Sequence, residues 1–326
     1  MNLEHVLDAM IEAPVVTSFT RLGYDARSRL AHWTPLGDYD LTGRVMLVTG
    51  ATSGLGLVAS EQLAACGATV VLLGRDAAKT ARVRDEIAAR TGNDTISTVI
   101  ADMGDLVAVR AAAAEVSARH DRLDVLVHNA GALSATRQVS PQGIELTVAS
   151  QVVGPFLLTT LLLPLLGASA PARVITMSSG GMYASPLHVE HLQMGDDYKG
   201  SEQYARAKRA QVTLDEMWAQ RRPERDIVFH AMHPGWADTP GVRESLPTFR
   251  KIVGPLLRSP AQGADTLVWL AADDGAPLRS TGAFWLDRRR RSIHKLPTTR
   301  ASDTPERRQA LWDWVLDASG AELPAN

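Results

Sequence analysis

A glycine-rich turn between two apolar segments constrains the fold of this chain more than any other feature. Residues 45–48 form an apolar run of the kind found in a strand that is buried on both faces. The turn TGATSGLG at 49–56 follows, then a helical apolar pattern that ends at Cys66, and then a second apolar run at 70–73. This order predicts one strand–turn–helix–strand unit over 44–75.

The glycines of this turn have a physical reason that points to a nucleotide. A diphosphate binds the free N–H groups at a helix N-terminus, where the helix dipole favours negative charge. Side chains in the turn would hold the backbone away from the phosphates. We therefore expect the turn to bind a dinucleotide. The residues expected to contact it here are Gly50, Thr52, Ser53, Gly54, Leu55 and Gly56.

The residue that follows the second strand distinguishes between two cofactors. A unit of this kind usually places an acidic residue there to hold the ribose hydroxyls of NAD, or an Arg nearby to hold the 2′-phosphate of NADP. This chain has Arg75 and then Asp76. A guanidinium suits phosphate through its paired donors, so we favour NADP(H), with NAD(H) as the alternative. A solvated surface side chain is the simpler interpretation of Arg75.

Composition excludes several classes of function. Of the 326 residues, 45% are hydrophobic and 21% charged, as in an ordinary soluble globule. The net charge of −2 gives no reason to expect nucleic acid as a partner. The single cysteine excludes an internal disulfide. His188 and His191, or His230 and His233, are spaced like ligand pairs, but no cysteine accompanies them and we expect no metal site.

No segment near the N-terminus resembles a secretory signal, so we expect a cytoplasmic protein. The longest apolar run, at 152–166, is too short for a bilayer and contains Pro155 and Pro164. We interpret it as part of a buried helix over 143–166.

Residues 1–43 form an N-terminal helical extension. Apolar residues recur at helical spacing up to Ile11, and Pro14 ends the pattern. The following segment either packs on the core as a second helix or serves as an arm that contacts a membrane surface or a partner. The second interpretation rests on aromatic residues accompanied by Arg21, Arg27 and Arg29.

Strand and helix patterns alternate after the nucleotide unit. Strands are predicted at 95–101, 123–127, 173–177, 227–232 and 283–286, and helices at 77–91, 105–119, 143–166, 203–221 and 260–272. This alternation predicts an α/β fold, a doubly wound parallel (Rossmann) sheet of about seven strands with helices on both faces. It forms a single domain at 44–290 with a substrate lid at 236–258, followed by a tail at 291–326 with a short helix.

Polar and small residues stand where the predicted strands end. The carboxyl ends of parallel strands meet at one edge of a sheet, so these residues are expected to line one site. They are Asp102, Met103, Asn129, Ala130, Gly131, Ser179, Pro234 and Gly235.

Tyr204 and Lys208 are four residues apart and therefore lie one turn apart on one face of a helix. A tyrosine with its ordinary pKa of about 10 is a poor acid–base catalyst at neutral pH. A neighbouring ammonium lowers that pKa and makes proton transfer to a carbonyl oxygen feasible. A chance pair of a Tyr and a Lys is the alternative.

Together these residues resemble the short-chain dehydrogenase/reductase family over about residues 44–286. The motifs that carry the resemblance are TGATSGLG (49–56), Asp102, HNAG (128–131), SSGG (178–181), YARAK (204–208) and HPGWADT (233–239). The segments TRLGYDARSRL (20–30) and HPGWADTPGV (233–242) further resemble a member-12-like subgroup with an N-terminal extension.

The resemblance implies an oxidoreductase that interconverts a carbonyl compound and its alcohol. It implies that Tyr204 protonates the substrate oxygen, that Lys208 holds the nicotinamide ribose, and that Ser179 hydrogen-bonds the carbonyl, with Ser178 as the second candidate. It further implies a homodimer or homotetramer built on the helix at 143–166 and the helix of Tyr204.

The resemblance also assigns the cofactor contacts. Asp102 would meet the adenine, Asn129 would support the cofactor channel, and Thr239 would meet the nicotinamide amide or a phosphate.

Gln151 departs from the family pattern. The family usually has an Asn three residues before a Gly in the long helix, where it holds a water that relays protons to the lysine. Here Gln151 precedes Gly154. It carries the same amide on one more methylene, so the relay is either kept with changed geometry or lost. We expect an active enzyme, and the alternative is an NADP(H)-binding protein that acts through its N-terminal arm.

The lid is rich in apolar side chains. They either line a pocket for a lipophilic aldehyde or ketone or pack on the domain's own helices. These side chains are Trp236, Leu246, Phe249, Ile252, Val253 and Leu256.

Overall fold

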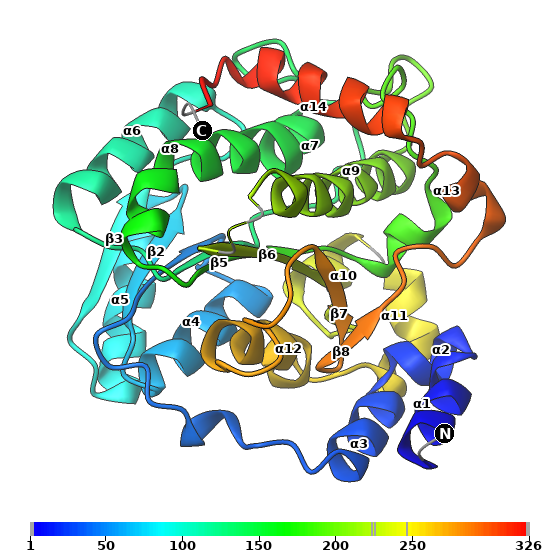
Figure 1. The fold of residues 1–326 in the computed structure, drawn as a ribbon, viewed down its shortest axis with the longest axis horizontal. Helices are drawn as coiled ribbons and strands as arrows, with labels where there is room; N and C mark the ends of the chain where they lie inside the picture. Colours follow the sequence, from blue (N-terminus) through cyan, green and yellow to red (C-terminus); the bar gives the residue numbers. More distant parts are fainter. Residues whose placement is uncertain (1–2, 223, 225, 246, 324–326) are drawn as a thin grey trace.

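The computed structural model describes residues 3–222, 224, 226–245 and 247–323, with only the backbone of 3–6. An eight-stranded sheet in the order β3-β2-β1-β4-β5-β6-β7-β8 forms its centre, parallel except for β8 (Figure 1). The strands are β1 (Val45–Thr49), β2 (Thr69–Gly74), β3 (Ile96–Ile100), β4 (Val125–His128), β5 (Ala172–Met177), β6 (Ile227–Met232), β7 (Ala283–Leu286) and β8 (Arg289–Arg291). The predicted doubly wound α/β fold is confirmed.

Helices cover both faces of the sheet because its central strands are apolar on both sides. Leu47 and Val71 belong to one core, and Met46 and Val70 belong to the other. The first core packs under α6 (Leu106–Arg119), α8 (Gly154–Ala168) and α9 (Gly200–Arg221), and the second under α4 (Gly54–Ala65), α5 (Ala77–Thr91) and α12 (Pro260–Ala272).

The eighth strand was not expected from the sequence. β7 and β8 form a hairpin whose turn residues, Asp287 and Arg288, have left-handed φ angles of 53° and 54°. Two-residue turns of this hand suit the twist of a hairpin. A run of arginines has no apolar alternation, so pattern reasoning could not identify it as an antiparallel edge strand.

The long apolar segment is a helix inside the protein, as predicted. It consists of α7 (Leu146–Val148), the π-helical turn η2 (Ala149–Val153) and α8. The helix Leu146–Ala168 is long and apolar enough to cross a membrane, but 83% of its apolar window is buried within the fold.

The N-terminal extension packs on the domain. It contains α1 (Leu3–Glu12), α2 (Val15–Phe19) and α3 (Arg21–Leu30), followed by a short 3₁₀ turn, η1 (Leu36–Asp38), and these helices lie beside the lid and β8 (Figure 1). Arg27 and Phe19 are buried, whereas Arg21 and Arg29 are exposed. Only part of the proposed membrane-surface arm is therefore available to a membrane.

The C-terminal tail holds α13 (Pro297–Ala301) and α14 (Pro305–Ser319), so its main helix is longer than expected. α14 lies across α8 and α9 (Figure 1). Its Trp312 ring packs 5.1 Å from Phe156 of α8 and 4.9 Å from Trp218 of α9. The helix surfaces that the resemblance assigned to an oligomer interface are thus covered by α14 where Trp312 packs.

Candidate active site

The glycine-rich turn is braced by Asn129. Gly50 and Gly54 have left-handed φ angles of 65° and 57°. Asn129 Nδ2 donates to the carbonyl oxygens of Thr49 at 2.9 Å and Gly50 at 3.2 Å. A Cβ on Gly56 would lie 2.3 Å from that Nδ2, so the contact requires glycine. Asn129 therefore holds the backbone of the turn in place through these two carbonyl groups.

The first turn of α4 fits the diphosphate of a dinucleotide. α4 begins at Gly54, and the side chain of its N-cap residue Ser53 makes no capping hydrogen bond within the helix. The N–H groups of the first turn point outward at the positive end of the helix dipole. Thr52 and Leu55 flank this position and are partly exposed.

Arg75 stands exposed directly after β2, as the sequence analysis expected of a cofactor-contacting residue. It makes no hydrogen bond or ion pair within the described part of the chain. Asp76 is the N-cap of α5, where its carboxylate accepts from Lys79 N at 2.9 Å. One oxygen of the Asp76 carboxylate is thus engaged at the start of α5, whereas the guanidinium of Arg75 is exposed.

The residues after β3 and β4 lie at the same edge of the sheet. Asp102 is exposed, and its Oδ1 accepts from Gly104 N at 2.8 Å. The side chain of Met103 is buried. Ala130 N donates to Thr49 Oγ1 at 3.0 Å, which joins β4 to β1. Gly131 is exposed beside Gln151.

Tyr204, Lys208 and Ser179 come together as predicted. Lys208 Nζ lies 5.3 Å from the centre of the Tyr204 ring and donates to Met177 O at 2.8 Å. Ser179 also interacts with the Tyr204 hydroxyl, where it acts to lower the tyrosine pKa. Ser178 Oγ instead donates to the backbone oxygen of Lys208 at 3.4 Å. Ser179 is therefore the serine that faces the tyrosine.

Burial dominates the titration of this pair. It raises the pKa of Tyr204 to about 12, against the smaller effect of the hydrogen bond with Ser179. It lowers the pKa of Lys208 to about 7, against the attraction of Asp215. We expected the ammonium of Lys208 to lower the pKa of Tyr204. In the protein without cofactor this expectation is wrong, because desolvation disfavours the charged forms of both side chains.

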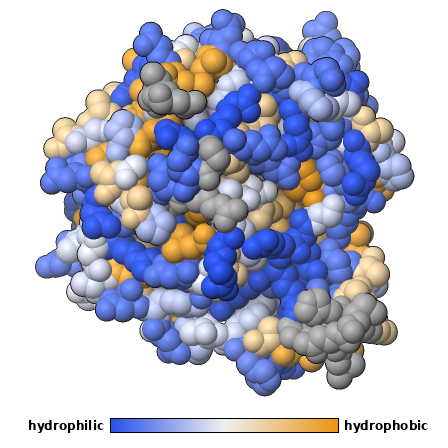
Figure 2. All heavy atoms as spheres, viewed as in Figure 1, coloured by the Kyte–Doolittle hydropathy of each residue, from blue (hydrophilic) through white to orange (hydrophobic). Residues whose placement is uncertain are grey.

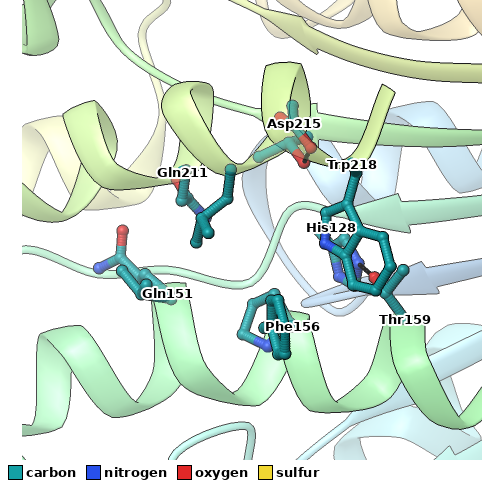
Figure 3. A pocket seen from close by; sticks show the side chains of 11 residues that line it. His128, Gln151, Phe156, Thr159, Gln211, Asp215 and Trp218 are labelled. Atoms are coloured by element: carbon teal, nitrogen blue, oxygen red, sulfur yellow. Dashed lines mark hydrogen bonds between the residues drawn. The ribbon is translucent and has the colours of Figure 1, made fainter. Parts of the chain in front are cut away.

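Gln151 borders a small cavity between α8 and α9 that is lined by both polar and apolar side chains (Figure 3). The cavity measures about 20 Å³. Gln151 is fully buried in η2, and its Nε2 donates to Ala132 O at 2.8 Å. Four atoms around the cavity have no protein partner among the described residues: Gln151 Oε1, His128 Nδ1, Gln211 Oε1 and Asp215 Oδ2. Buried polar atoms without a protein partner are usually satisfied by ordered water.

The segment after β6 meets the glycine-rich turn. A Cβ on Gly54 would lie 3.7 Å from Thr239 Cβ, so Thr239 is next to the expected diphosphate site. Gly235 has a φ of 72°, and a Cβ there would lie 2.2 Å from Arg258 Nε. Pro234 O accepts from Arg258 Nη1 at 3.4 Å. Arg258 was not among the predicted site residues, because nothing in the sequence indicates that the side chain of this arginine is buried.

The two histidine pairs serve other purposes. His233 is buried, and its Nδ1 accepts from Gly235 N at 3.2 Å. A ring nitrogen of buried His230 contacts Pro277 O at 2.9 Å. His188 lies 3.7 Å from the Glu190 carboxylate. His233 belongs to the wall of the candidate site, where it packs on Phe19.

The segment predicted to be a lid, 236–258, contains α10 (Pro240–Ser245), α11 (Pro247–Val253) and η4 (Gly254–Leu256). The rings of Trp236 and Phe249 pack edge-to-face at 5.0 Å. Ile252 is 75% exposed and cannot line a pocket. Leu246 lies outside the described residues. Val253 and Leu256 are half-buried.

Comparison with known proteins agrees with this geometry. The model of the short chain dehydrogenase family matches residues 44–248. The chain belongs to the short-chain dehydrogenase/reductase family. It is 39% identical to human "Dehydrogenase/reductase SDR family member 12" over 295 residues, which cover 90% of this chain and 91% of that protein. The member-12-like resemblance is confirmed.

Other relatives in this family are enzymes by name. Human "Retinol dehydrogenase 11" is 30% identical, over 87% of this chain and 88% of that protein. The solved NADP active-site complex of Pseudomonas aeruginosa RhlG is 26% identical and covers 77% of this chain and 96% of its own, with a TM-score of 0.63. The chain is thus a member of an oxidoreductase family with a nucleotide-binding Rossmann fold.

Proposed function

We propose that this protein is an NADP(H)-dependent oxidoreductase that reduces a lipophilic aldehyde or ketone, or oxidises the corresponding alcohol. The observation that carries the proposal is that Tyr204 and Ser179 come together beside the buried Lys208, whose Nζ lies 5.3 Å from the centre of the Tyr204 ring. These residues stand at the edge of the sheet where the glycine-rich turn is built for a dinucleotide.

In this proposal Tyr204, Ser179 and Lys208 have separate roles in the reduction of the carbonyl group. When bound, the nicotinamide supplies the hydride that reduces the carbonyl carbon. Tyr204 Oη donates its proton to the carbonyl oxygen, and Ser179 Oγ donates a hydrogen bond that orients this oxygen. Lys208, in its charged form, stabilises the phenolate left on Tyr204. The turn at 49–56 would hold the diphosphate.

Further observations support the preference for NADP(H) and the lipophilic substrate. Arg75 is exposed and free to bind a 2′-phosphate, and a solved relative is an NADP complex. The edge-to-face pair of Trp236 and Phe249 in the lid supports an apolar substrate, as does a relative named retinol dehydrogenase.

The test is NADPH and NADH oxidation with a panel of apolar aldehydes and ketones. We expect turnover with NADPH, a loss of at least about 100-fold in kcat in Tyr204→Phe because the proton donor is removed, and weaker NADPH binding with unchanged NADH binding in Arg75→Ala. Tight NADPH binding without turnover in either direction would contradict the enzyme proposal and favour a binding protein that acts through its N-terminal arm.

We further propose a cytoplasmic protein that can touch a membrane through the outer face of its N-terminal arm. Met10, Val16 and Leu22 of the arm are exposed, and so are Arg21 and Arg29. Exposed apolar side chains next to basic ones suit an anionic lipid surface.

A further inference from the structure

The N-terminal arm, here residues 7–30, contacts both ends of the lid. We propose that Ser18, Phe19 and Thr20 of the arm lock the base of the lid, residues 236–258, and thereby position its apolar side chains over the substrate. The locking is a property of the fold, and only the effect on substrate rests on the proposed function.

Backbone hydrogen bonds form the first part of this lock. At the start of the lid, Trp236 N donates to Phe19 O at 2.7 Å. At its end, Arg258 Nη2 donates to Ser18 O at 2.9 Å, and Arg258 Nε donates to Phe19 O at 3.1 Å and Thr20 O at 3.3 Å. The two ends are also joined, because Arg258 N donates to Trp236 O at 2.8 Å and Asp238 N to Arg258 O at 3.0 Å.

The side chain of Phe19 forms the second part. It is 4% exposed, and its ring lies edge-on to His233 at 4.4 Å and to Trp236 at 5.8 Å. Trp236 in turn packs on Phe249 at 5.0 Å. A row of aromatic contacts therefore runs from the arm into the lid, so a movement of Phe19 is transmitted to Phe249.

Buried charges hold the arm itself in place. Asp287, in the turn between β7 and β8, is fully buried. It accepts from Arg27 Nη1 at 2.6 Å and from Arg258 at 2.6 and 2.9 Å. One carboxylate thus ties an arginine of the arm to the arginine at the end of the lid. A buried pair of this kind tolerates little displacement, because a separated charge would remain without a partner.

The arm also reaches the backbone beside the candidate catalytic serine. A Cβ on Gly180, the neighbour of Ser179, would lie 2.9 Å from Phe19 Cε2 and 3.0 Å from His233 Nε2. The arm is therefore packed against the wall of the site. Phe19 is a positioning residue, since it acts through His233 and Trp236.

Hydrogen exchange of the full chain tests the lock without any need for turnover. In Phe19→Ala we expect amide exchange in peptides from 236–258 to rise about tenfold, because the aromatic support of the lid base is lost. Phe19→Leu, which retains most of the volume, should restore most of the protection. The matched control is Leu311→Ala on α14, a fully buried large-to-small change remote from the lid. Equal exchange of the lid in wild type and Phe19→Ala, or equal increases in Phe19→Ala and Leu311→Ala, would overturn the proposal.

Kinetics then test the effect on substrate. We expect Phe19→Ala to raise KM for the carbonyl substrate about tenfold with a smaller change in kcat and with unchanged NADPH affinity, and Leu311→Ala to leave KM unaltered. An unchanged KM in a Phe19→Ala protein with a loosened lid would overturn the positioning role. If wild type shows no turnover at all, the proposed function fails, while the exchange result still decides whether the arm locks the lid.

Discussion

At the scale of single residues, Asp287 makes the least predictable contribution to this molecule. It occupies a left-handed position with a φ of 53°, which Asp tolerates better than most residues. Its carboxylate is shared by Arg27 and Arg258, which lie 260 and 29 residues away along the chain. Such a partnership leaves no local pattern in the sequence.

Replacing Asp287 by Asn should destabilise the protein strongly. Asn keeps the shape of the side chain and its tolerance of the left-handed backbone, so the change isolates the charge. Because Arg258 would then lie buried without its counter-charge, we expect a loss of about 3–5 kcal/mol in the free energy of unfolding. Urea denaturation measures this loss, with Asp121→Asn on the exposed surface as the control. A midpoint equal to that of the control would show that the cluster does not stabilise the fold.

The catalytic candidates were predictable for the opposite reason. Tyr204 and Lys208 have a fixed spacing on one helix, and Ser179 follows a buried strand, so their placement depends on local structure alone. Their titration was not predictable, because it depends on how deeply the fold buries them. Phe19 and Arg258 were missed since each acts through contacts that only the folded chain creates.

At the scale of elements, the π-helical turn η2 is the irregularity that carries Gln151. Single π-turns inside α-helices frequently occur at functional sites. Here the turn carries Gln151 into the space between α8 and α9, where its amide bridges Ala132 O and the cavity. The extra methylene of Gln relative to Asn is thus used to reach that carbonyl.

Gln151→Met tests whether this amide matters. Met has a similar length but no polar atoms, so Ala132 O would lose its donor and the cavity one of its four polar atoms. We expect a loss of about 1–3 kcal/mol in the free energy of unfolding and a reduced kcat at an unchanged NADPH affinity. Gln151→Asn is the matched variant that keeps the amide. Equal kcat values in all three proteins would mean that Gln151 takes no part in proton transfer.

The element pattern itself was largely predictable. Seven strands and the six main helices of the domain stand close to their expected positions because a sheet buried on both faces demands continuous apolar runs. β8 was not predicted, because its arginines are held by contacts with Asp8 and Trp285 rather than by apolar burial. α14 was underestimated, since its contacts with Phe156 and Trp218 lie far away in the sequence.

At the scale of the whole molecule, the face shown in Figure 2 is mostly hydrophilic with scattered hydrophobic patches. Several of the most exposed large apolar side chains belong to the N-terminal arm, among them Met10 at 68%, Leu22 at 49% and Val16 at 48%. Arg27 and Phe19 face inward. The arm therefore has an inner face that serves the fold and an outer face that is free to meet another surface.

Co-sedimentation with vesicles tests the outer face. We expect the full chain to pellet with vesicles rich in anionic lipid at low salt and to be released at high salt, because Arg21 and Arg29 flank the apolar residues. A Met10→Ser, Val16→Ser, Leu22→Ser variant should remain in the supernatant. Substitution is preferable to deletion of the arm, since its inner face supports the lid. If wild type also stays in the supernatant, the proposed membrane contact is wrong.

The position of α14 has a consequence for how the chain is made. Until α14 has left the ribosome, the apolar surface of α8 and α9 around Phe156 and Trp218 lacks the cover that Trp312 supplies. Arg27 can pair with Asp8 and Glu12 inside the arm, but its third partner, Asp287, is synthesised 260 residues later. Contacts between such distant segments form slowly during folding. Packing of α8 and α9 is therefore completed only once α14 has been synthesised, and a nascent chain stalled before α14 should expose this apolar surface.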